Sequence, residues 1–234
     1  MEGPLALVGG DELNPGNEPQ DELLVSAAGA GPAYVLATAA ARQHPELAVR
    51  NAQGWFGGLG LEVAELPART RTQAKNPDNV ALARSGRFFY LVGGDPGLTV
   101  DSLVDTPLWD AIVESWRGGA ALAGSSAGAM AMGSWSLVRG RFKGDPQRRR
   151  KTALALVPGL AVAPHFETFG HRWVDSAVST GDEAVVLGID ERSAAVWTGG
   201  AWRAMGAGGV TLIARGGRRR FESGEGIGGL RPPG

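Results

Sequence analysis

The amino-acid sequence predicts an α/β fold: a three-layer sandwich with a mostly parallel central sheet between helices, and short strands near the C-terminal end. Apolar runs typical of buried strands alternate with helical patterns at the spacing of βαβ units. Hydrophobic residues make up 43% of the 234 residues, enough for a sizeable core. Near the C-terminal end, glycine-rich turns separate short apolar runs, as in hairpins.

The first half of the chain predicts four strands and the helices that connect them. The helical segment with the clearest amphipathic pattern is 45–59, where apolar residues recur at steps of three and four. We expect strands at 4–10, 33–38, 61–66 and 87–92, a loop at 11–22, and helices at 21–28, 45–59 and 79–85, with Asp21 as the cap of the first helix.

The second half predicts a helix, a buried strand and a short helix, followed later by the C-terminal strands. These elements are expected at 108–116, 119–124, 127–132, 185–189, 194–197, 202–205 and 210–214. Between them, residues 139–151 hold seven basic residues and one acid. We interpret this basic segment as a solvated, mobile loop, and its alternative is a basic flap over an acidic substrate.

The domain organisation follows from length and composition. A chain of this size suits one α/β domain, expected over residues 1–222, and the glycine-rich residues 223–234 predict a disordered tail. The N-terminus lacks a basic segment followed by a long apolar run, and no stretch approaches 18 apolar residues. We therefore expect a cytoplasmic protein with no membrane partner, and a homo-oligomer stays open.

Composition excludes several classes of chemistry. With 23 basic and 24 acidic residues, the balanced charge gives no indication of a nucleic-acid partner. The absence of cysteine excludes disulfides, thiolate metal sites and a cysteine nucleophile. No cluster of metal ligands is visible, so no metal or cofactor is expected. Acyl transfer would therefore need a serine, a threonine or a carboxylate.

The segment with the clearest chemical signal is 124–128, which fits G-x-S-x-G with Ser126 at its centre. A nucleophile at a sharp strand-to-helix turn needs small neighbours, because the backbone there is strained. An apolar run precedes the motif and good helix formers follow it. We predict Ser126 as the nucleophile, with the N–H of Ala127 as one donor to the oxyanion.

A serine nucleophile needs a general base, which is usually a histidine. The chain has three histidines. His165 follows an apolar run at a predicted strand end, and we prefer it as the base over a half-buried structural role. His44 precedes a proline at a predicted helix start and reads as a surface residue, and His171 is a weaker candidate.

A third group should orient the imidazole and stabilise its charged form. Glu191 and Asp190 follow a predicted strand, Glu167 lies beside the histidine, and Asp145 lies in the basic segment. The residues alone leave these alternatives open.

Four motifs occur in a fixed order: Gly-Gly-Asp at 93–95, Gly-Ser-Ser-Ala-Gly-Ala at 124–129, Pro-His-Phe at 164–166 and Gly-Ile-Asp-Glu at 188–191. Together they resemble the dipeptidase E / cyanophycinase family of serine peptidases, over about residues 5–214. The resemblance implies a class I glutamine-amidotransferase-like α/β fold, with serine in place of the amidotransferase cysteine.

Carried over by position, the resemblance implies Ser126 as nucleophile, His165 as base and Glu191 as the acid, with Asp145 as the alternative acid. The turn at Gly94 and Asp95 is expected to supply the second oxyanion donor beside Ala127.

Two positions near these motifs bear on specificity. Pro96 stands where a polar residue is common in the family, and it has no N–H to donate. Arg172 follows the His-Phe pair and could bind a substrate carboxylate, or be an ordinary surface residue.

The sequence thus predicts a serine peptidase that hydrolyses short peptides through a Ser-His-Glu/Asp triad, with a preference for acidic residues left open. The alternatives are an amidase or another acyl hydrolase, and a non-catalytic amidotransferase-like binding protein.

Overall fold

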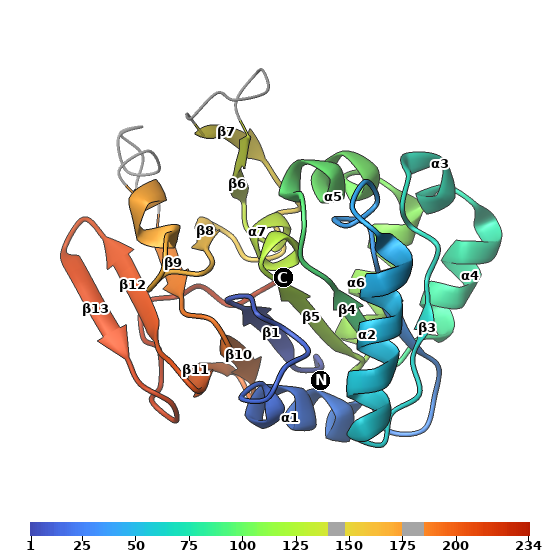
Figure 1. Ribbon diagram of the computed structural model, residues 1–234, viewed down its shortest axis with the longest axis horizontal. Helices are drawn as coiled ribbons and strands as arrows, with labels where there is room; N and C mark the ends of the chain where they lie inside the picture. The colour runs from blue at the N-terminus through green and yellow to red at the C-terminus, as the bar shows by residue number, and fades with distance from the viewer. Residues whose placement is uncertain (140–147, 175–184) are drawn as a thin grey trace.

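The computed structural model describes residues 1–139, 148–174 and 185–234. Its centre is a seven-stranded sheet in the order β11-β10-β1-β5-β4-β2-β3 (Figure 1). The five strands β1, β5, β4, β2 and β3 run parallel, and β10 and β11 are antiparallel to their neighbours. Their bounds are β1 Leu5–Val8, β2 Ala33–Leu36, β3 Ala64–Glu65, β4 Phe88–Leu91, β5 Ala121–Ser125, β10 Ser193–Thr198 and β11 Ala201–Gly206.

Helices cover both faces of this sheet. Successive side chains of a strand point to opposite faces. Phe88 and Tyr90 of β4 belong to the cluster under α1 (Glu18–Ala28) and α2 (Pro45–Gly58), whereas Phe89 and Leu91 belong to the cluster on the opposite face. The helices whose buried residues join that second cluster are α3 Arg71–Ala74, α4 Pro77–Ser85, α5 Pro96–Leu103, α6 Pro107–Arg117 and α7 Ala127–Met132. The predicted three-layer α/β fold is confirmed.

A second sheet packs beside the first, in the order β13-β12-β9-β8. Its strands are β8 Leu160–Ala163, β9 Val185–Ile189, β12 Val210–Ala214 and β13 Gly217–Phe221. Strands β8 and β9 run parallel, and β13 is one of the two edge strands, with exposed arginines at 218–220. Buried residues of this sheet share one core with the α3–α7 side of the large sheet, so the two sheets are packed together.

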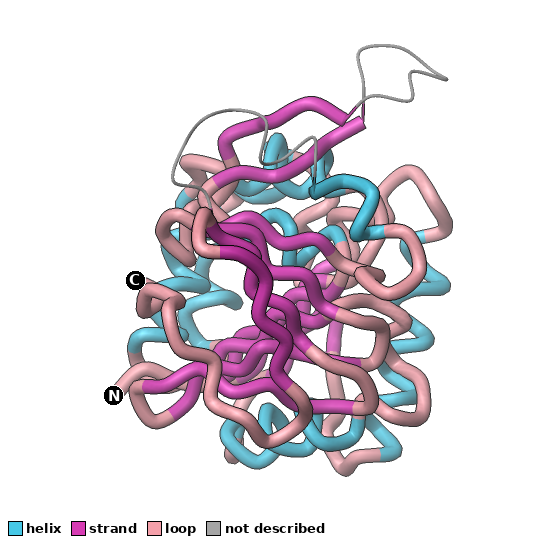
Figure 2. The backbone as a smooth tube through the Cα atoms, turned by 90° about the vertical axis from the view of Figure 1, so that its left-hand side faces the viewer, coloured by secondary structure: helices cyan, strands magenta, loops and turns pink. Residues whose placement is uncertain are grey.

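The strands β6 (Trp135–Arg139) and β7 (Arg148–Thr152) form a separate antiparallel hairpin at the top of the molecule in both Figure 1 and Figure 2, and Trp135 and Leu137 pack β6 into the core. The sequence predicts a solvated loop over 139–151, but residues 148–152 form a strand. Pairing with the apolar strand β6 explains the difference, and the guanidinium of Arg150 lies 4.5 Å from the ring centre of Trp135. Asp145 lies outside the described residues.

The first helix differs from its prediction. It begins at Glu18, inside the expected loop, with Pro19 in the first turn, where a missing N–H costs nothing. Asp21 is therefore not a helix cap. Its side chain is fully buried between α1 and α2, where the indole Nε1 of Trp55 donates a hydrogen bond of 2.8 Å to Asp21 Oδ2.

Helix α5 is absent from the predicted elements, although its start carries a recognisable signal. Asp95 caps the helix by accepting a hydrogen bond of 2.8 Å from the N–H of Gly97, and Pro96 occupies the first turn. The predicted strand at 61–66 is reduced to the two residues of β3, because only these pair with β2.

Residues 223–234 are packed against β11, in contrast to the disorder expected from their glycine content. Ile227 is buried, and the N–H of Ala204 donates to the carbonyl of Glu225 at 2.9 Å. The indole of Trp202 donates a hydrogen bond of 3.0 Å to the carbonyl of Arg231. A buried isoleucine and these hydrogen bonds oppose the entropy of a glycine-rich segment.

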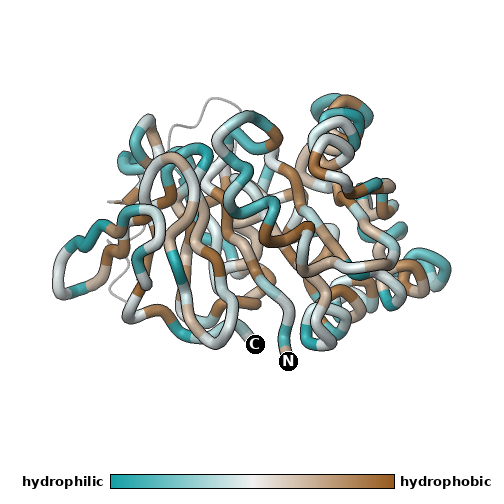
Figure 3. The backbone as a smooth tube through the Cα atoms, turned by 90° about the horizontal axis from the view of Figure 1, so that it is seen from below, coloured by the Kyte–Doolittle hydropathy of each residue, from teal (hydrophilic) through white to brown (hydrophobic). Residues whose placement is uncertain are grey.

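The hydropathy of the chain follows this layered arrangement. Hydrophobic stretches lie along the strands in the interior, and hydrophilic ones lie mainly at the outer turns and helix surfaces (Figure 3). In the part of the chain that the structure describes, no helix combines the length and the apolar character needed to cross a bilayer.

The buried carboxyl of Asp21 predicts a pH-dependent stability. Burial raises its pKa from 3.8 to about 7, and the hydrogen bond from Trp55 opposes that rise. Because the folded state holds the proton more tightly than the unfolded chain, the free energy of unfolding falls as the pH rises from about 4 to about 7.

We expect Asp21→Asn, whose side chain cannot ionise, to remove this fall in the free energy of unfolding with rising pH. Between pH 5 and pH 8 the free energy of unfolding should fall by roughly 2–3 kcal/mol more in the wild type than in the variant. Urea denaturation of both proteins at the two pH values measures the difference. Equal pH dependence in the two proteins would contradict an uncharged Asp21 at pH 5.

Candidate active site

Ser126 lies at the turn between β5 and α7, in a backbone conformation that serine rarely adopts. Its φ and ψ are 46° and −107°, and its N–H donates a hydrogen bond of 2.9 Å to the carbonyl of Val8 on β1. Such strain persists only where the surrounding structure fixes it. The turn holds the hydroxyl at the carboxyl-end edge of the sheet, where ligands of parallel α/β sheets bind.

Two glycines allow this turn to form. A Cβ at Gly124 would lie 2.6 Å from the carbonyl carbon of Gly128, and a Cβ at Gly128 would lie 2.4 Å from the carbonyl oxygen of Leu91. Both distances are too short for a side chain. Helix α7 therefore lies directly against the ends of β5 and β4 only because these positions are glycine.

His165 and Glu191 meet Ser126 from the second sheet. His165 follows β8 and Glu191 follows β9, two strands that run parallel and end side by side. The Oγ of Ser126 lies 3.1 Å from Nε2 of His165, and Nδ1 of His165 lies 2.7 Å from Oε1 of Glu191. The structure thus aligns the three residues in the order serine, imidazole, carboxylate, which suits proton transfer from the serine.

The His165 imidazole is also held by an aromatic neighbour. Its ring stacks on that of Phe169, with 4.9 Å between ring centres, and Phe169 in turn contacts Trp173 edge to face. These aromatic residues belong to or precede the short 3-10 helix η1 (Gly170–Trp173).

The other two described acids near the histidine have different partners. Asp190 is buried and pairs with the guanidinium of Arg220 at 2.6 Å. Both carboxyl oxygens of Glu167 lie 3.1 Å from the backbone nitrogen of Glu191, whose N–H donates to them. Partial desolvation raises the pKa of Glu167, and the nearby Asp190 carboxyl adds to that rise. Glu167 and Asp190 therefore surround the Glu191 turn rather than contact the imidazole.

The remaining histidines lie outside this arrangement. His44 is exposed at the start of α2, as the sequence indicates. His171 lies in η1, where its Nδ1 is 3.1 Å from the carbonyl oxygen of Phe166.

Of the three predicted oxyanion donors, the structure is compatible with Ala127 and Gly94 but not with Asp95. The N–H of Ala127 begins α7, directly after the nucleophile. The N–H of Asp95 donates a hydrogen bond of 2.9 Å to the carbonyl of Ala39, so it cannot serve an oxyanion. This corrects the prediction for Asp95 and leaves Gly94 as the candidate donor of that turn.

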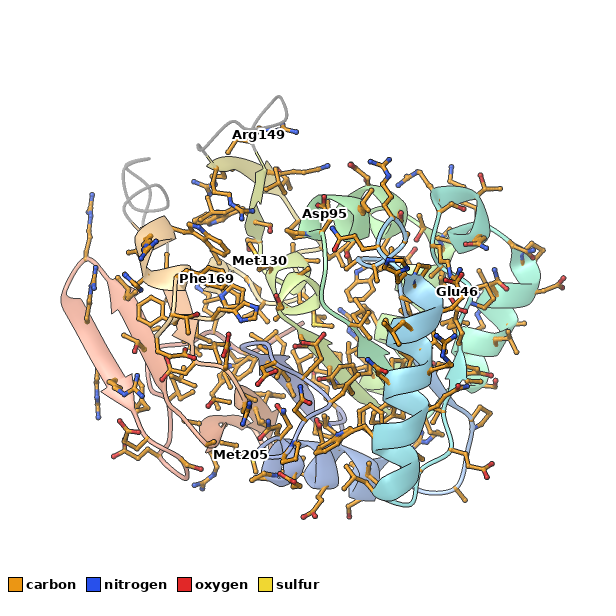
Figure 4. The ribbon with its side chains drawn as sticks, viewed as in Figure 1. Glu46, Asp95, Met130, Arg149, Phe169 and Met205 are labelled. Carbon is orange, nitrogen blue, oxygen red and sulfur yellow. The ribbon has the colours of Figure 1, made fainter. Side chains whose placement is uncertain are left out.

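A cavity of about 290 Å³ opens beside Ser126. Figure 4 shows Met130 and Phe169 at this site, Asp95 near it and Arg149 above it on the β6–β7 hairpin. The residues that line the cavity are Gly94, Pro96, Ser126, Met130, Arg148, Pro164, His165, Phe169 and Trp173. A larger cavity of about 680 Å³ lies between α6 and residues 152–156 and includes none of them.

Among the described residues, the arginine that lines the cavity is Arg148 rather than the predicted Arg172, which is exposed on η1. The guanidinium of Arg148 lies 4.3 Å from the ring centre of Trp173. Sequence reasoning missed Arg148 individually, although the alternative of a basic flap over an acidic substrate included it. Among the described residues, no group of three or more histidines, aspartates or glutamates could hold a metal ion.

A serine at a strained strand-to-helix turn, aligned with a histidine and a carboxylate, is the arrangement of serine hydrolases. Within that class the chain belongs to peptidase family S51, whose family model matches residues 5–205. The resemblance to the dipeptidase E / cyanophycinase type, inferred from the four motifs, is confirmed.

Two curated relatives are cyanophycinases. That of Nostoc sp. (strain PCC 7120 / SAG 25.82 / UTEX 2576) is 32% identical over 193 residues, covering 80% of this chain and 65% of the relative. That of Synechococcus elongatus is 29% identical over 181 residues, covering 74% of this chain and 56% of the relative. The chain thus spans less than two thirds of the length of these relatives.

Two solved structures share the fold. The crystal structure of a peptidase from an acI-B1 Actinobacterium has a TM-score of 0.84 at 30% identity, over 97% of both chains. A protein described as a peptidase E from Listeria monocytogenes EGD-e has a TM-score of 0.63 at 17% identity, over 88% of this chain and 100% of that one, and shows the fold alone.

The position of Glu191 predicts the effect of removing its charge. Glu191→Gln keeps the shape of the side chain but cannot stabilise a charged imidazole. We expect kcat to fall by about 10³–10⁴-fold with little change in melting temperature. Asp145→Asn, which changes the alternative acid, should be measured on the same substrate. If Asp145→Asn is the inactive variant and Glu191→Gln is nearly normal, the assignment of the acid is wrong.

Proposed function

We propose that this protein is a serine peptidase that hydrolyses short peptides, with Ser126, His165 and Glu191 as its catalytic triad. The observation that carries the proposal is the continuous line of contacts from Ser126 Oγ to His165 Nε2, at 3.1 Å, and from His165 Nδ1 to Glu191 Oε1, at 2.7 Å. Family membership supports the peptidase assignment.

The proposed reaction follows from these positions. Ser126 Oγ attacks the carbonyl carbon of the scissile bond while His165 Nε2 takes its proton, and Glu191 stabilises the resulting imidazolium. The N–H groups of Gly94 and Ala127 bind the oxyanion. His165 then gives its proton to the leaving amine, and a water molecule hydrolyses the acyl-enzyme by the same route.

The size of the cavity supports a short substrate. A volume of about 290 Å³ holds a few residues of peptide, and the β6–β7 hairpin contributes one of its walls through Arg148. The relatives named cyanophycinase and the peptidase from the acI-B1 Actinobacterium are consistent with hydrolysis of an amide bond.

We further propose that the cavity prefers substrates with a carboxylate, bound by Arg148. Arg148 lines the cavity, and its guanidinium is held against the Trp173 ring at 4.3 Å, which orients it at little further cost in entropy. Guanidinium–carboxylate pairs are strong where water is partly excluded. Arg149, its neighbour on β7, is exposed and does not line the cavity.

An amidase or another acyl hydrolase would use the same machinery and differ only in the cavity. A non-catalytic binding protein is less compatible with the site, because binding alone does not require a strained serine aligned with a histidine and a carboxylate.

The nucleophile is tested directly by Ser126→Ala. A fluorophosphonate probe should label the wild type at one site and leave the variant unlabelled, and peptide turnover should fall by about 10⁶-fold. Ser85→Ala, which removes an exposed hydroxyl on α4 away from the cavity, is the control and should still be labelled. Turnover in Ser126→Ala within tenfold of the wild type would contradict the proposal.

The carboxylate preference is tested by Arg148→Met, which keeps the apolar stem and loses the charge. We expect kcat/KM for a dipeptide with an acidic residue to fall about 10–100-fold, and that for the matching amide-bearing dipeptide to change less than threefold. Arg149→Met is the matched control and should affect both substrates equally and weakly. Equal losses for both dipeptides in Arg148→Met would contradict a carboxylate site.

A further inference from the structure

Glu12 lies in the loop after β1 and connects two segments that are distant in sequence. Its Oε1 accepts a hydrogen bond of 2.7 Å from the N–H of Gly93, and its Oε2 accepts one of 2.9 Å from the hydroxyl of Ser125. One segment precedes the candidate oxyanion donor Gly94, and the other precedes the nucleophile Ser126. The proposed reaction gives this carboxylate no role.

The turn that carries Gly94 is intrinsically flexible. Gly93 and Gly94 are adjacent glycines, and Gly94 has a φ of 140°. Glycine pairs sample many conformations, so holding one of them costs conformational entropy. Two anchors flank the Gly94 N–H: the bond from Gly93 to Glu12, and the bond of 2.9 Å from the Asp95 N–H to the carbonyl of Ala39.

The same carboxylate connects this turn to the nucleophile turn. Ser125 is fully buried at the end of β5, and its hydroxyl donates to Glu12. The two turns are also in close packing, because a Cβ at Gly93 would lie 2.8 Å from Glu12 Oε1 and 3.4 Å from the Ser126 Cβ. The position of Gly94 relative to Ser126 therefore depends on both oxygens of Glu12.

We propose that Glu12 is a positioning residue that fixes the Gly93–Gly94 turn against the nucleophile turn, and so holds the Gly94 N–H where an oxyanion develops. Its consequence for catalysis rests on the function proposed above. Glu12 acts through Gly93 and Ser125 and does not touch the substrate. Loss of a single oxyanion donor lowers kcat by about 10²–10³-fold, which bounds the effect expected from misplacing one.

Three substitutions at Glu12 distinguish the effect of losing the two hydrogen bonds from the effect of losing the negative charge. Glu12→Ala removes both bonds, and Glu12→Asp keeps the charge but is one methylene too short to reach both partners. Glu12→Gln keeps the length: its carbonyl accepts from Gly93, and its amide donates to the Ser125 hydroxyl, which can also accept. The inference predicts that the neutral glutamine is the best replacement and that the charged aspartate is worse.

The kinetic experiment measures kcat and KM for one short peptide. We expect Glu12→Ala and Glu12→Asp to lower kcat about 10–100-fold with KM within threefold of the wild type, and Glu12→Gln to stay within about fivefold in kcat. Glu18→Asp is the matched control, since Glu18 likewise accepts a glycine N–H, that of Gly16, but is bonded to neither the Gly93–Gly94 turn nor the nucleophile turn. It should leave kcat unchanged.

A second measurement does not depend on catalysis. Amide hydrogen exchange in a peptide that spans 92–95 should become at least tenfold faster in Glu12→Ala and Glu12→Asp but not in Glu12→Gln, while exchange in the core strands stays the same. Should Glu12→Ala fail to fold, Glu12→Asp and Glu12→Gln still give the comparison.

The outcomes distinguish this inference from the proposed function. Faster exchange at 92–95 in a wild-type background that hydrolyses no peptide and takes no fluorophosphonate would refute the peptidase and support the role of Glu12 in holding the turn. An active wild type with unchanged exchange, or with kcat of Glu12→Asp within threefold of the wild type, would overturn the role of Glu12. An equal loss of kcat in Glu12→Gln and Glu12→Asp would overturn it too.

Discussion

The close contact of helix α7 with the ends of β5 and β4 is the constraint on which the site depends. A side chain at Gly124 or Gly128 would push the helix away and relax the backbone strain at Ser126. Because β1, β5 and β4 are parallel neighbours, their carboxyl ends bring the loop that holds Glu12, the serine turn and the Gly93–Gly94 turn to one edge. The nucleophile and its surroundings thus follow from strand order and from two positions that lack a Cβ.

The base and the acid come from the junction between the two sheets. Glu191 lies between β9 of the small sheet and β10 of the large one, so a single short connection spans the boundary. The N–H of His165 donates to the carbonyl of Gly9 at 2.7 Å, and that of Arg192 donates to the carbonyl of Gly10 at 2.9 Å. The loop after β1 therefore holds both sides of the site, and relative movement of the sheets would separate the serine from its base.

Short sequence patterns predict those site residues whose positions depend on the local backbone. The G-x-S-x-G spacing indicates Ser126, the end of an apolar run indicates His165, and Glu191 stays one of several candidate acids. That His165 and Ser126 come from different sheets could not be predicted from these patterns. The engagement of the Asp95 N–H could not be predicted, because its partner, the carbonyl of Ala39, comes from another loop. Likewise, Arg148 reaches the cavity only through pairing of β7 with β6, which a run of arginines does not indicate.

The edge strand β13 bears on how the protein behaves in solution. An open edge offers unpaired backbone groups to a strand of another molecule, which is a common route to aggregation. Here Arg218 and Arg219 are exposed and Arg220 pairs with Asp190 and Glu222, so a second copy aligned along the same edge would bring the guanidinium groups of Arg218 and Arg219 close to those of the first copy. Their repulsion opposes intermolecular sheet growth, and dissolved ions weaken that repulsion by screening it. Association of two copies through this edge should accordingly be weakest at low ionic strength.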